Sequence, residues 1–215
     1  PCARGRAAPA AIAVATGRAA GMGLVFRKGT ALEALARADT VVLDKTGTLT
    51  RGKPTLVRVL PFGLSQEEAL RLAAALERGS EHPLAKAVLE AAESLPQAQA
   101  EEVRALPGEG VEGRVEGRRL HLGGPALMER LGVPLPEEAK ALPEEGYTPL
   151  YLVEGTRLLA AFAVFDPPRP EAQEAVAALK ALGLKLVLLT GDHPAPARRV
   201  AEALGIPEVL AGVRP

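Results

Sequence analysis

The residues best suited to chemistry are those at 44–50, Asp-Lys-Thr-Gly-Thr-Leu-Thr, where a carboxylate is followed by hydroxyl groups and a glycine. The reference pKa of an aspartate is about 3.9, so Asp44 is ionised at neutral pH and can attack phosphorus without a separate base. Gly47 lets the backbone turn tightly, with N–H groups and hydroxyls directed into one small space that suits a phosphate. The pattern therefore predicts a nucleophile beside a phosphate-binding turn.

The element that must position this carboxylate is a strand directly before it. Residues 40–43, Thr-Val-Val-Leu, form a short apolar run rich in β-branched side chains, which is typical of a fully buried parallel strand. Asp44 then lies at the carboxyl edge of the sheet, where open α/β sheets place their ligands. Residues 30–39 predict a short helix that leads into this strand, with Thr30 as its N-cap.

Residues 44–50 resemble the phosphorylation signature of the P-type ATPases, cation pumps whose catalytic domain belongs to the haloacid dehalogenase-like phosphotransferases. The alternative is an ordinary strand and turn with Asp44 as an N-cap, and a seven-residue match behind an apolar strand argues against it. The resemblance implies catalytic roles for Asp44, Lys45 and Thr46. Thr48 is expected to contact the nucleotide. The Asp44 carboxylate and the Thr46 carbonyl are expected to hold Mg²⁺.

The residue two places after Asp44 separates pumps from phosphatases within this superfamily. Phosphatases usually carry a second aspartate there, which protonates the leaving group, whereas this chain has Thr46. ADP leaves readily as an anion and needs no such acid. A pump-type ATPase is therefore expected. The two alternatives are a soluble phosphatase of the same superfamily and a non-catalytic, nucleotide-binding regulatory module.

The same resemblance implies a second phosphate-contacting loop at Thr190-Gly191-Asp192, which follows the apolar run 184–189. Thr190 is expected to donate its hydroxyl to the transferred phosphoryl group. Gly191 is expected to lie against the phosphate, and Asp192 to orient the loop or to contact Mg²⁺ indirectly. The alternative is that Asp192 only caps the next helix.

A third resemblance lies at 80–85, Ser-Glu-His-Pro-Leu-Ala, which is similar to the nucleotide-domain signature of the heavy-metal pumps. Glu77 stands five residues before His82, as in that family, where both residues lie at the adenine end of ATP. A neutral imidazole can stack on a purine, and a carboxylate can accept a hydrogen bond from the exocyclic amine. The alternative is that His82 merely separates two helices.

Residues 108–113 form a GxGxxG pattern, which by itself is a weak signal. A dinucleotide fingerprint needs a helix after the glycines, but alternating valines and charged residues predict a strand. We expect Gly108 and Gly110 to let ATP approach the backbone, with a plain hairpin turn as the alternative. The pumps often carry a Gly-Asn pair after the next strand. Here residues 123–124 are Gly-Gly, so the hydrogen bond that the Asn side chain would give to the nucleotide is not expected.

The order of the predicted elements divides the chain into two folding units. We expect an α/β fold in which 30–54 and 165–215 form a doubly wound, haloacid dehalogenase-like parallel sheet, the phosphorylation domain. Residues 55–164, with helices and antiparallel strands, are expected to be an inserted α+β nucleotide-binding domain. Asp166 and Arg169 resemble the hinge motif of the family and are expected to be structural rather than catalytic.

Residues 1–29 resemble the second half of the metal-binding membrane helix of heavy-metal pumps and the linker after it. In that helix Cys-Pro-Cys supplies soft thiolates, so Cys2 is expected to bind Cu(I) in the parent protein only. Arg4 and Arg6 depart from the family, and each arginine costs about 2.5–3.5 kcal/mol at bilayer depth. No apolar run reaches the roughly 20 residues of a membrane helix. We expect a soluble polypeptide whose parent lies in the cell membrane, with this region on the cytoplasmic side.

The composition of the chain limits the classes of partner that we expect it to bind. The 26 basic and 26 acidic side chains give a formal net charge of zero, so nucleic acid is not an expected partner. The single cysteine excludes an internal disulfide. The resemblance implies ATP and the parent's transmembrane and actuator domains as partners of a monomeric chain. It also places a lysine and further Mg²⁺-binding aspartates beyond residue 215, so we expect nucleotide binding with incomplete catalysis.

Overall fold

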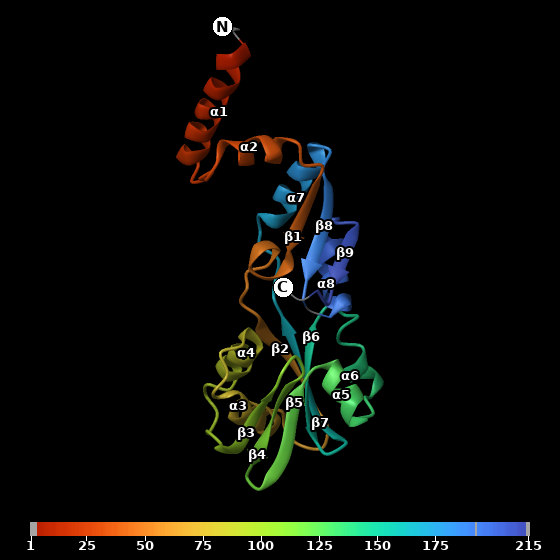
Figure 1. Ribbon diagram of the computed structural model, residues 1–215. Coiled ribbons are helices and arrows are strands. Elements are labelled where there is room, and N and C mark those ends of the chain that lie inside the picture. Colours follow the sequence, from red (N-terminus) through yellow and green to blue (C-terminus); the bar gives the residue numbers. More distant parts are fainter. Residues whose placement is uncertain (1–3, 192, 214–215) are drawn as a thin grey trace.

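The molecule contains two β-sheets of different kinds (Figure 1). The structure is a computed structural model that describes residues 4–191 and 193–213. The first sheet is parallel, with strand order β1-β8-β9, and the second is antiparallel, with order β2-β7-β6-β5-β4-β3. The strands are β1 (Thr40–Asp44), β2 (Thr55–Pro61), β3 (Ala100–Leu106), β4 (Gly110–Val115), β5 (Arg118–Gly123), β6 (Thr148–Glu154), β7 (Arg157–Phe165), β8 (Lys185–Thr190) and β9 (Glu208–Ala211). The helices are α1 (Arg4–Gly21), α2 (Gly29–Ala36), α3 (Gln66–Glu77), α4 (Pro83–Ala91), α5 (Pro125–Leu131), α6 (Glu137–Lys140), α7 (Ala172–Ala181) and α8 (Pro194–Leu204), and a π-helical turn, η1 (Lys45–Leu49), follows β1. The chain leaves the parallel sheet after β1, builds the antiparallel unit and returns through α7, which confirms the predicted fold class.

The parallel sheet packs against α7 and α8. Strands β1 and β8 pair with Leu43 opposite Leu188. Leu186 and Leu188 of β8 share one buried cluster with Val176 of α7 and Val200 of α8. Burying a leucine or valine fully contributes about 1.5–3 kcal/mol relative to leaving it exposed. This cluster therefore fixes the strand whose carboxyl end carries the predicted second phosphate loop.

The prediction that β1 is fully buried is wrong. Thr40, Val42 and Asp44 are exposed, and the exposed fraction of Val42 is 55%. Val41 and Leu43 are partly buried against the α7–α8 cluster. Within the described residues β1 stands at the end of the strand order, so packing covers mainly one of its faces. An apolar run identifies a strand, but the number of covered faces depends on neighbours that are remote in sequence.

The antiparallel sheet carries helices on both faces (Figure 1). Helices α3 and α4 pack on one face, where Leu76 and Phe162 are buried in one cluster. Helices α5 and α6 pack on the other face around Tyr151. The Tyr151 hydroxyl donates to the Ala139 carbonyl at 2.9 Å, and burial raises the pKa of Tyr151 to about 12. This unit therefore has its own hydrophobic core.

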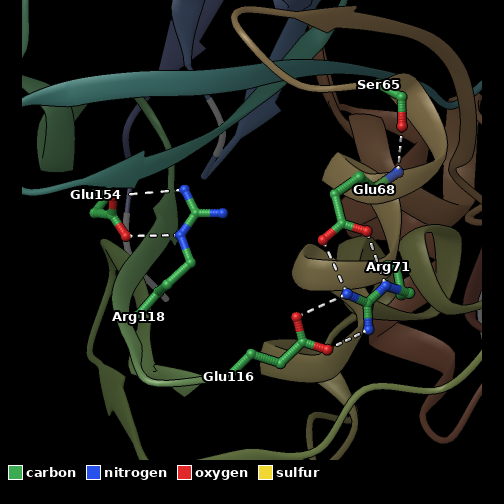
Figure 2. Close-up of polar contacts among 6 residues, drawn as sticks. All are labelled: Ser65, Glu68, Arg71, Glu116, Arg118 and Glu154. Carbon is green, nitrogen blue, oxygen red and sulfur yellow. Dashed lines mark hydrogen bonds and ion pairs between the residues drawn. The ribbon is translucent and has the colours of Figure 1, made fainter.

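Charged contacts tie α3 to the turn between β4 and β5 (Figure 2). Ser65 caps α3 by accepting a hydrogen bond from the Glu68 N–H at 3.1 Å. Arg71 pairs with Glu68 at 2.9 Å and with Glu116 at 2.7 Å, and hydrogen bonds to Glu116 and then to Glu68 raise the pKa of Arg71. Glu116 has a φ of 52°, a left-handed conformation that a glutamate rarely adopts. The paired carboxylate of Glu116 thus holds the tip of the β4–β5 hairpin against α3.

The two N-terminal helices extend away from both sheets (Figure 1). Across residues 4–191 and 193–213, the structure contains no helix long and apolar enough to cross a membrane. Helix α2 starts at Gly29 after the N-cap residue Lys28, and Thr30 lies in its first turn, so the prediction that Thr30 caps this helix is wrong. A threonine favours a helix start without fixing it, because the flanking backbone decides where helical dihedral angles begin. The predicted copper ligand Cys2 lies outside the described residues.

Candidate functional site

Asp44 and Thr190 leave the same edge of the parallel sheet. Asp44 is the last residue of β1 and lies opposite Leu189, so Thr190 follows immediately at the carboxyl end of the neighbouring strand. The Asp44 residue is exposed, whereas Thr190 is 3% exposed. Gly191 follows Thr190 beside the Val213 carbonyl, and Asp192 lies outside the described residues. The topology therefore brings the two predicted phosphate loops together.

The turn after Asp44 is shaped by one glycine. Within η1, Gly47 has φ 80° and Thr46 has extended dihedrals of φ −78° and ψ 120°. Among the described residues no atom lies within 4 Å of a Cβ placed on Gly47, so the need for glycine comes from the backbone angle and not from crowding. The Lys45 side chain is buried, at 5% exposed. The turn presents exposed backbone directly after the carboxylate that the sequence identifies as a nucleophile.

A buried threonine closes this turn. Thr50 is 0% exposed, and its hydroxyl donates to the Asp166 carboxylate at 2.6 Å. The same oxygen lies 3.1 Å from the Lys45 carbonyl and accepts from the Gly47 N–H at 3.3 Å. Asp166 is 116 residues away in sequence, at the point where the chain returns from the antiparallel unit. The sequence pattern predicts no role for Thr50 by itself, and its place at the end of the 44–50 motif is the signal that points to it.

Arg169 holds the same turn from outside. Its Nη2 donates to the Gly47 carbonyl at 2.9 Å, and its Nε donates to the Thr50 carbonyl at 3.2 Å. Its backbone N–H donates to the Leu49 carbonyl at 2.8 Å. Planar guanidinium groups suit such paired contacts. Asp166 and Arg169 therefore bind the backbone and hydroxyl of the turn, which is the structural part expected of them.

Glu77 is a buried carboxylate at the end of α3. It is 9% exposed, and burial raises its pKa above the ordinary value, while a side-chain hydrogen bond with Ser80 acts in the opposite direction. Burying a carboxylate disfavours its charged form unless hydrogen bonds compensate. A carboxylate buried in this way is a candidate binding group.

His82 lies five residues further on and begins the next helix. It is the N-cap of α4, and its Nδ1 accepts from the Leu84 N–H at 3.2 Å, so a neutral ring carries its proton on Nε2. The residue is exposed. The Nδ1 atom of His82 therefore has a local role at the start of α4. Because the residue is exposed, a ligand could still contact the rest of the ring.

The backbone conformation favours glycine at positions 108 and 110, whether or not a ligand binds there. Gly108 and Gly110 have φ values of 75° and 150°, and they form the turn from β3 into β4. A Cβ on Gly110 would lie 2.1 Å from the Leu122 carbonyl oxygen of the neighbouring strand. Close strand approach is sufficient to require glycine at position 110. Whether ATP also uses this exposed backbone stays a prediction.

Comparison with known proteins gives the family. The model of the haloacid dehalogenase-like hydrolases matches residues 38–214. The chain belongs to the haloacid dehalogenase-like hydrolases. Copper-transporting ATPase 1 of Rhizobium meliloti (strain 1021) is 43% identical over 221 residues, which cover 100% of this chain and 27% of the relative. Copper-exporting P-type ATPase B of Archaeoglobus fulgidus is 40% identical over 217 residues, covering 100% of this chain and 31% of that protein.

A solved structure extends this likeness to three dimensions. The crystal structure of a zinc-transporting PIB-type ATPase in the E2.Pi state superposes with a TM-score of 0.70 at 39% identity, covering 96% of this chain and 34% of that one. The predicted resemblance to the phosphorylation and nucleotide-binding region of heavy-metal P-type ATPases is confirmed. The chain spans about a third of the length of these relatives, or less.

The predicted Mg²⁺ site at Asp44 and Thr46 of this haloacid dehalogenase-like hydrolase stays a prediction. The Asp44 carboxylate and the Thr46 carbonyl are hard oxygen donors of the type that Mg²⁺ prefers. Within the two described stretches there is no group of three or more His, Cys, Asp or Glu side chains that could hold a metal. Mg²⁺ commonly binds through one or two carboxylates together with substrate phosphates and water, so this donor set fits an ion that arrives with a nucleotide.

Replacing Glu77 by glutamine is expected to stabilise the protein at neutral pH while weakening ATP binding about fivefold, since a neutral acceptor is the weaker one. The raised pKa means that stability present below the unfolded-state pKa is lost as the pH rises through the folded-state pKa. A glutamine side chain does not ionise, so the variant does not lose stability in this way as the pH rises. Thermal melts across a pH series and calorimetric titration with ATP measure both effects. A variant that melts below the wild type at pH 7 would contradict the sign of the first effect.

Replacing Gly110 by alanine is expected to destabilise the antiparallel unit by about 1–3 kcal/mol, because the added Cβ meets the Leu122 carbonyl. Gly117→Ala is the matched control, since Gly117 also has a positive φ, of 78°, but no atom of the described residues lies within 4 Å of its Cβ position. Urea denaturation should rank Gly110→Ala as the less stable variant. Equal midpoints would show that backbone strain, and not strand approach, sets the requirement at Gly110.

Proposed function

We propose that this chain is the ATP-binding and phosphorylation region of a P-type ATPase, in which Asp44 accepts the γ-phosphoryl group of ATP. The observation that carries the proposal is the position of Asp44, at the carboxyl end of β1 beside Thr190 and directly before a turn fixed from the Asp166–Arg169 segment. The relatives that cover the whole chain are named as ATPases of this class.

We assign a different function to the unit built on each sheet. We assign residues 30–54 and 165–215 to phosphoryl transfer and residues 55–164 to nucleotide binding. In the second unit Glu77 accepts from the exocyclic amine of adenine, His82 contacts the purine ring, and the backbone around 108–110 lies against the nucleotide. The triphosphate then has to reach the turn after Asp44 in the first unit, so transfer requires the two units to close on one nucleotide.

The proposed transfer needs no proton. An Asp44 carboxylate oxygen attacks the γ-phosphorus, a new O–P bond forms, and the bond to the β–γ bridging oxygen breaks with its electron pair leaving on ADP. The Thr190 hydroxyl and the N–H groups of the turn stabilise charge on the phosphoryl oxygens. Thr46 offers no acid, and ADP requires none. When bound at Asp44 and the Thr46 carbonyl, Mg²⁺ would offset negative charge on the phosphates.

The transported ion is inferred from a residue outside the two catalytic units, which span residues 30–215. We infer Cu(I), because Cys2 supplies a soft thiolate and the relatives named above are copper ATPases. The zinc-transporting neighbour is 39% identical to this chain, and the copper-exporting Archaeoglobus relative is 40% identical. The sequence of the catalytic region therefore does not distinguish the two ions, and Cys2 carries the inference. ATPase activity of a full-length protein stimulated by Zn²⁺ and not by Cu(I) would overturn this assignment.

Acid-quenched labelling with [γ-³²P]ATP tests the central proposal. The protein used is this chain, together with a full-length pump that carries residues 38–214 in place of its own region. We expect a hydroxylamine-labile phosphate on Asp44 in the full-length protein, located by peptide mapping, and weak labelling of the isolated chain. Phosphate on a serine or threonine, or an unlabelled full-length protein that still binds ATP, would reject the proposal.

A further inference from the structure

A hydrogen bond joins the two units at a point away from the segments that connect them. The Arg199 Nε of α8 donates to the Glu144 carbonyl at 2.6 Å, so the bond runs from the phosphorylation unit to the turn before β6. The arginine side chain also lies against Gly146, where an added Cβ would be 3.3 Å from the Arg199 Cγ. Arg199 and Glu144 are exposed. The bond therefore ties the units together without belonging to either hydrophobic core.

Each end of this bond is anchored in its own unit. The residue after the donor, Val200, is buried in the cluster that packs α8 on the parallel sheet. The residue after the acceptor, Glu145, pairs with Arg58 of β2 at 3.0 Å. Backbone hydrogen bonds within residues 141–147 fold that segment into a tight turn. A change in the angle between the units must therefore stretch or break the bond, because neither end is free to follow.

The bond lies on the side of the connection that faces away from the proposed nucleotide path. The units are joined by residues 51–54 and 166–167. Helices α3 and α4 pack on one face of the antiparallel sheet, and α6, which precedes the Glu144 turn, packs on the other. In the view of Figure 1, α4 and the turn after β1 lie on one side of the connection, and α6 and α8 lie on the other. Bringing α4 toward the turn after β1 therefore pulls Arg199 away from its acceptor.

We propose that Arg199 is a positioning residue: its bond to the Glu144 carbonyl opposes further closure of the two units on the nucleotide and breaks before phosphoryl transfer. This inference rests on the proposed function, in which ATP binds the antiparallel unit and reaches Asp44. Breaking the bond costs free energy that would otherwise appear as affinity for ATP. Adenosine has no phosphates to reach Asp44, so it binds the antiparallel unit alone and leaves the bond intact.

Calorimetric titration of the 215-residue chain with ATP and with adenosine tests the proposal. Arg199→Ala is expected to bind ATP about fivefold more tightly than the wild type and adenosine equally, since only ATP requires closure. Arg199→Lys keeps a donor and should fall between the wild type and the alanine variant. Arg198→Ala removes the same charge from an exposed neighbour on α8 and should change neither affinity. Unchanged or weaker ATP binding by Arg199→Ala would overturn the proposal.

A reversible cross-link tests the same contact in the opposite direction. A Cβ on Gly146 would lie 3.4 Å from the Arg199 Cβ, close to the separation of about 3.5–4.5 Å in disulfides. A Gly146→Cys/Arg199→Cys pair, in a Cys2→Ser background, should therefore form a disulfide with oxidised glutathione. The oxidised chain is expected to bind ATP about tenfold more weakly than the reduced chain, and adenosine equally. Equal ATP affinities of the two forms, or a pair that stays reduced, would contradict the proposed role.

Labelling of the full-length protein distinguishes positioning from a merely structural role. Arg199→Ala should lower the ATP concentration for half-maximal labelling about fivefold without lowering the maximal rate, whereas a damaged fold would lower the rate at every concentration. Arg199→Met keeps the length of the side chain without a donor, so it provides the same test if the alanine variant melts early. A methionine variant with the wild-type half-maximal concentration would count against the proposal.

The proposed function can fail separately from this inference. If Glu77→Ala and His82→Ala leave the affinities for ATP and adenosine unchanged, nucleotide binding at these residues is wrong, and the inference falls with it. If both variants weaken binding while Arg199→Ala binds ATP as the wild type does, only the positioning role of Arg199 is overturned.

Discussion

Asp44→Asn is expected to abolish phosphorylation by ATP and to leave ATP bound at least as tightly as before. The amide cannot form the acyl phosphate, and removal of a covalent nucleophile lowers rates by at least about 10⁴-fold. The affinity should be kept because Glu77 and His82 lie in the antiparallel unit, whereas Asp44 ends a strand of the parallel sheet. Losing a negative charge near the phosphates removes a repulsion with the nucleotide, which offsets the loss of one proposed Mg²⁺ ligand.

The measurement is the labelling assay in the full-length protein, with calorimetric titration of the isolated chain. Asp39→Asn is the matched control, because Asp39 is an exposed aspartate just before β1 whose carboxylate accepts from the Thr40 hydroxyl at 2.8 Å. It should label as the wild type does. Stoichiometric, hydroxylamine-labile labelling of Asp44→Asn would place the phosphate elsewhere and remove the basis of the proposed function.

Asp166→Ala is expected to destabilise the turn that follows Asp44. The variant removes the acceptor of the 2.6 Å bond from the buried Thr50 hydroxyl, and hydrogen bonds to charged groups contribute about 1.5–3 kcal/mol. The turn carries Gly47 and directly follows the proposed nucleophile, so a shift of about 1 Å there should slow phosphorylation on the order of 10²-fold. The binding of ATP should change little, since Asp166 contacts the turn after Asp44, whereas Glu77 ends α3.

A double-mutant cycle with Thr50→Val separates the Thr50–Asp166 bond from other effects of the two substitutions. The two losses in free energy of unfolding, measured by urea denaturation, should be markedly less than additive, because each variant breaks the same bond. Asp166→Asn keeps an oxygen that can accept from Thr50 and should fall between the wild type and alanine. Additive losses, or an unchanged rate of phosphorylation in Asp166→Ala, would show that the turn is held mainly by Arg169.

Local patterns in the sequence carried the prediction of the reactive groups. The carboxylate, the glycine and the hydroxyls at 44–50 lie within one turn of chain, so their chemistry follows from adjacency. The apolar run before Asp44 placed it at the end of a strand, and β1 ends at Asp44. Glu77 and His82 lie five residues apart in the sequence, and the structure places them at the end of α3 and at the N-cap of α4.

Contacts between remote segments were decided only by the tertiary structure. Thr50 and Asp166 are 116 residues apart, and nothing in the pattern around either residue predicts their hydrogen bond. The exposure of Val42 depends on which neighbours flank β1, and the need for Gly110 depends on a carbonyl of the next strand. Sequence determined which groups are predicted to be reactive, because side-chain chemistry and short-range backbone geometry are local. Packing determined what holds and covers them, because burial and hydrogen bonding depend on chain segments that meet only after folding.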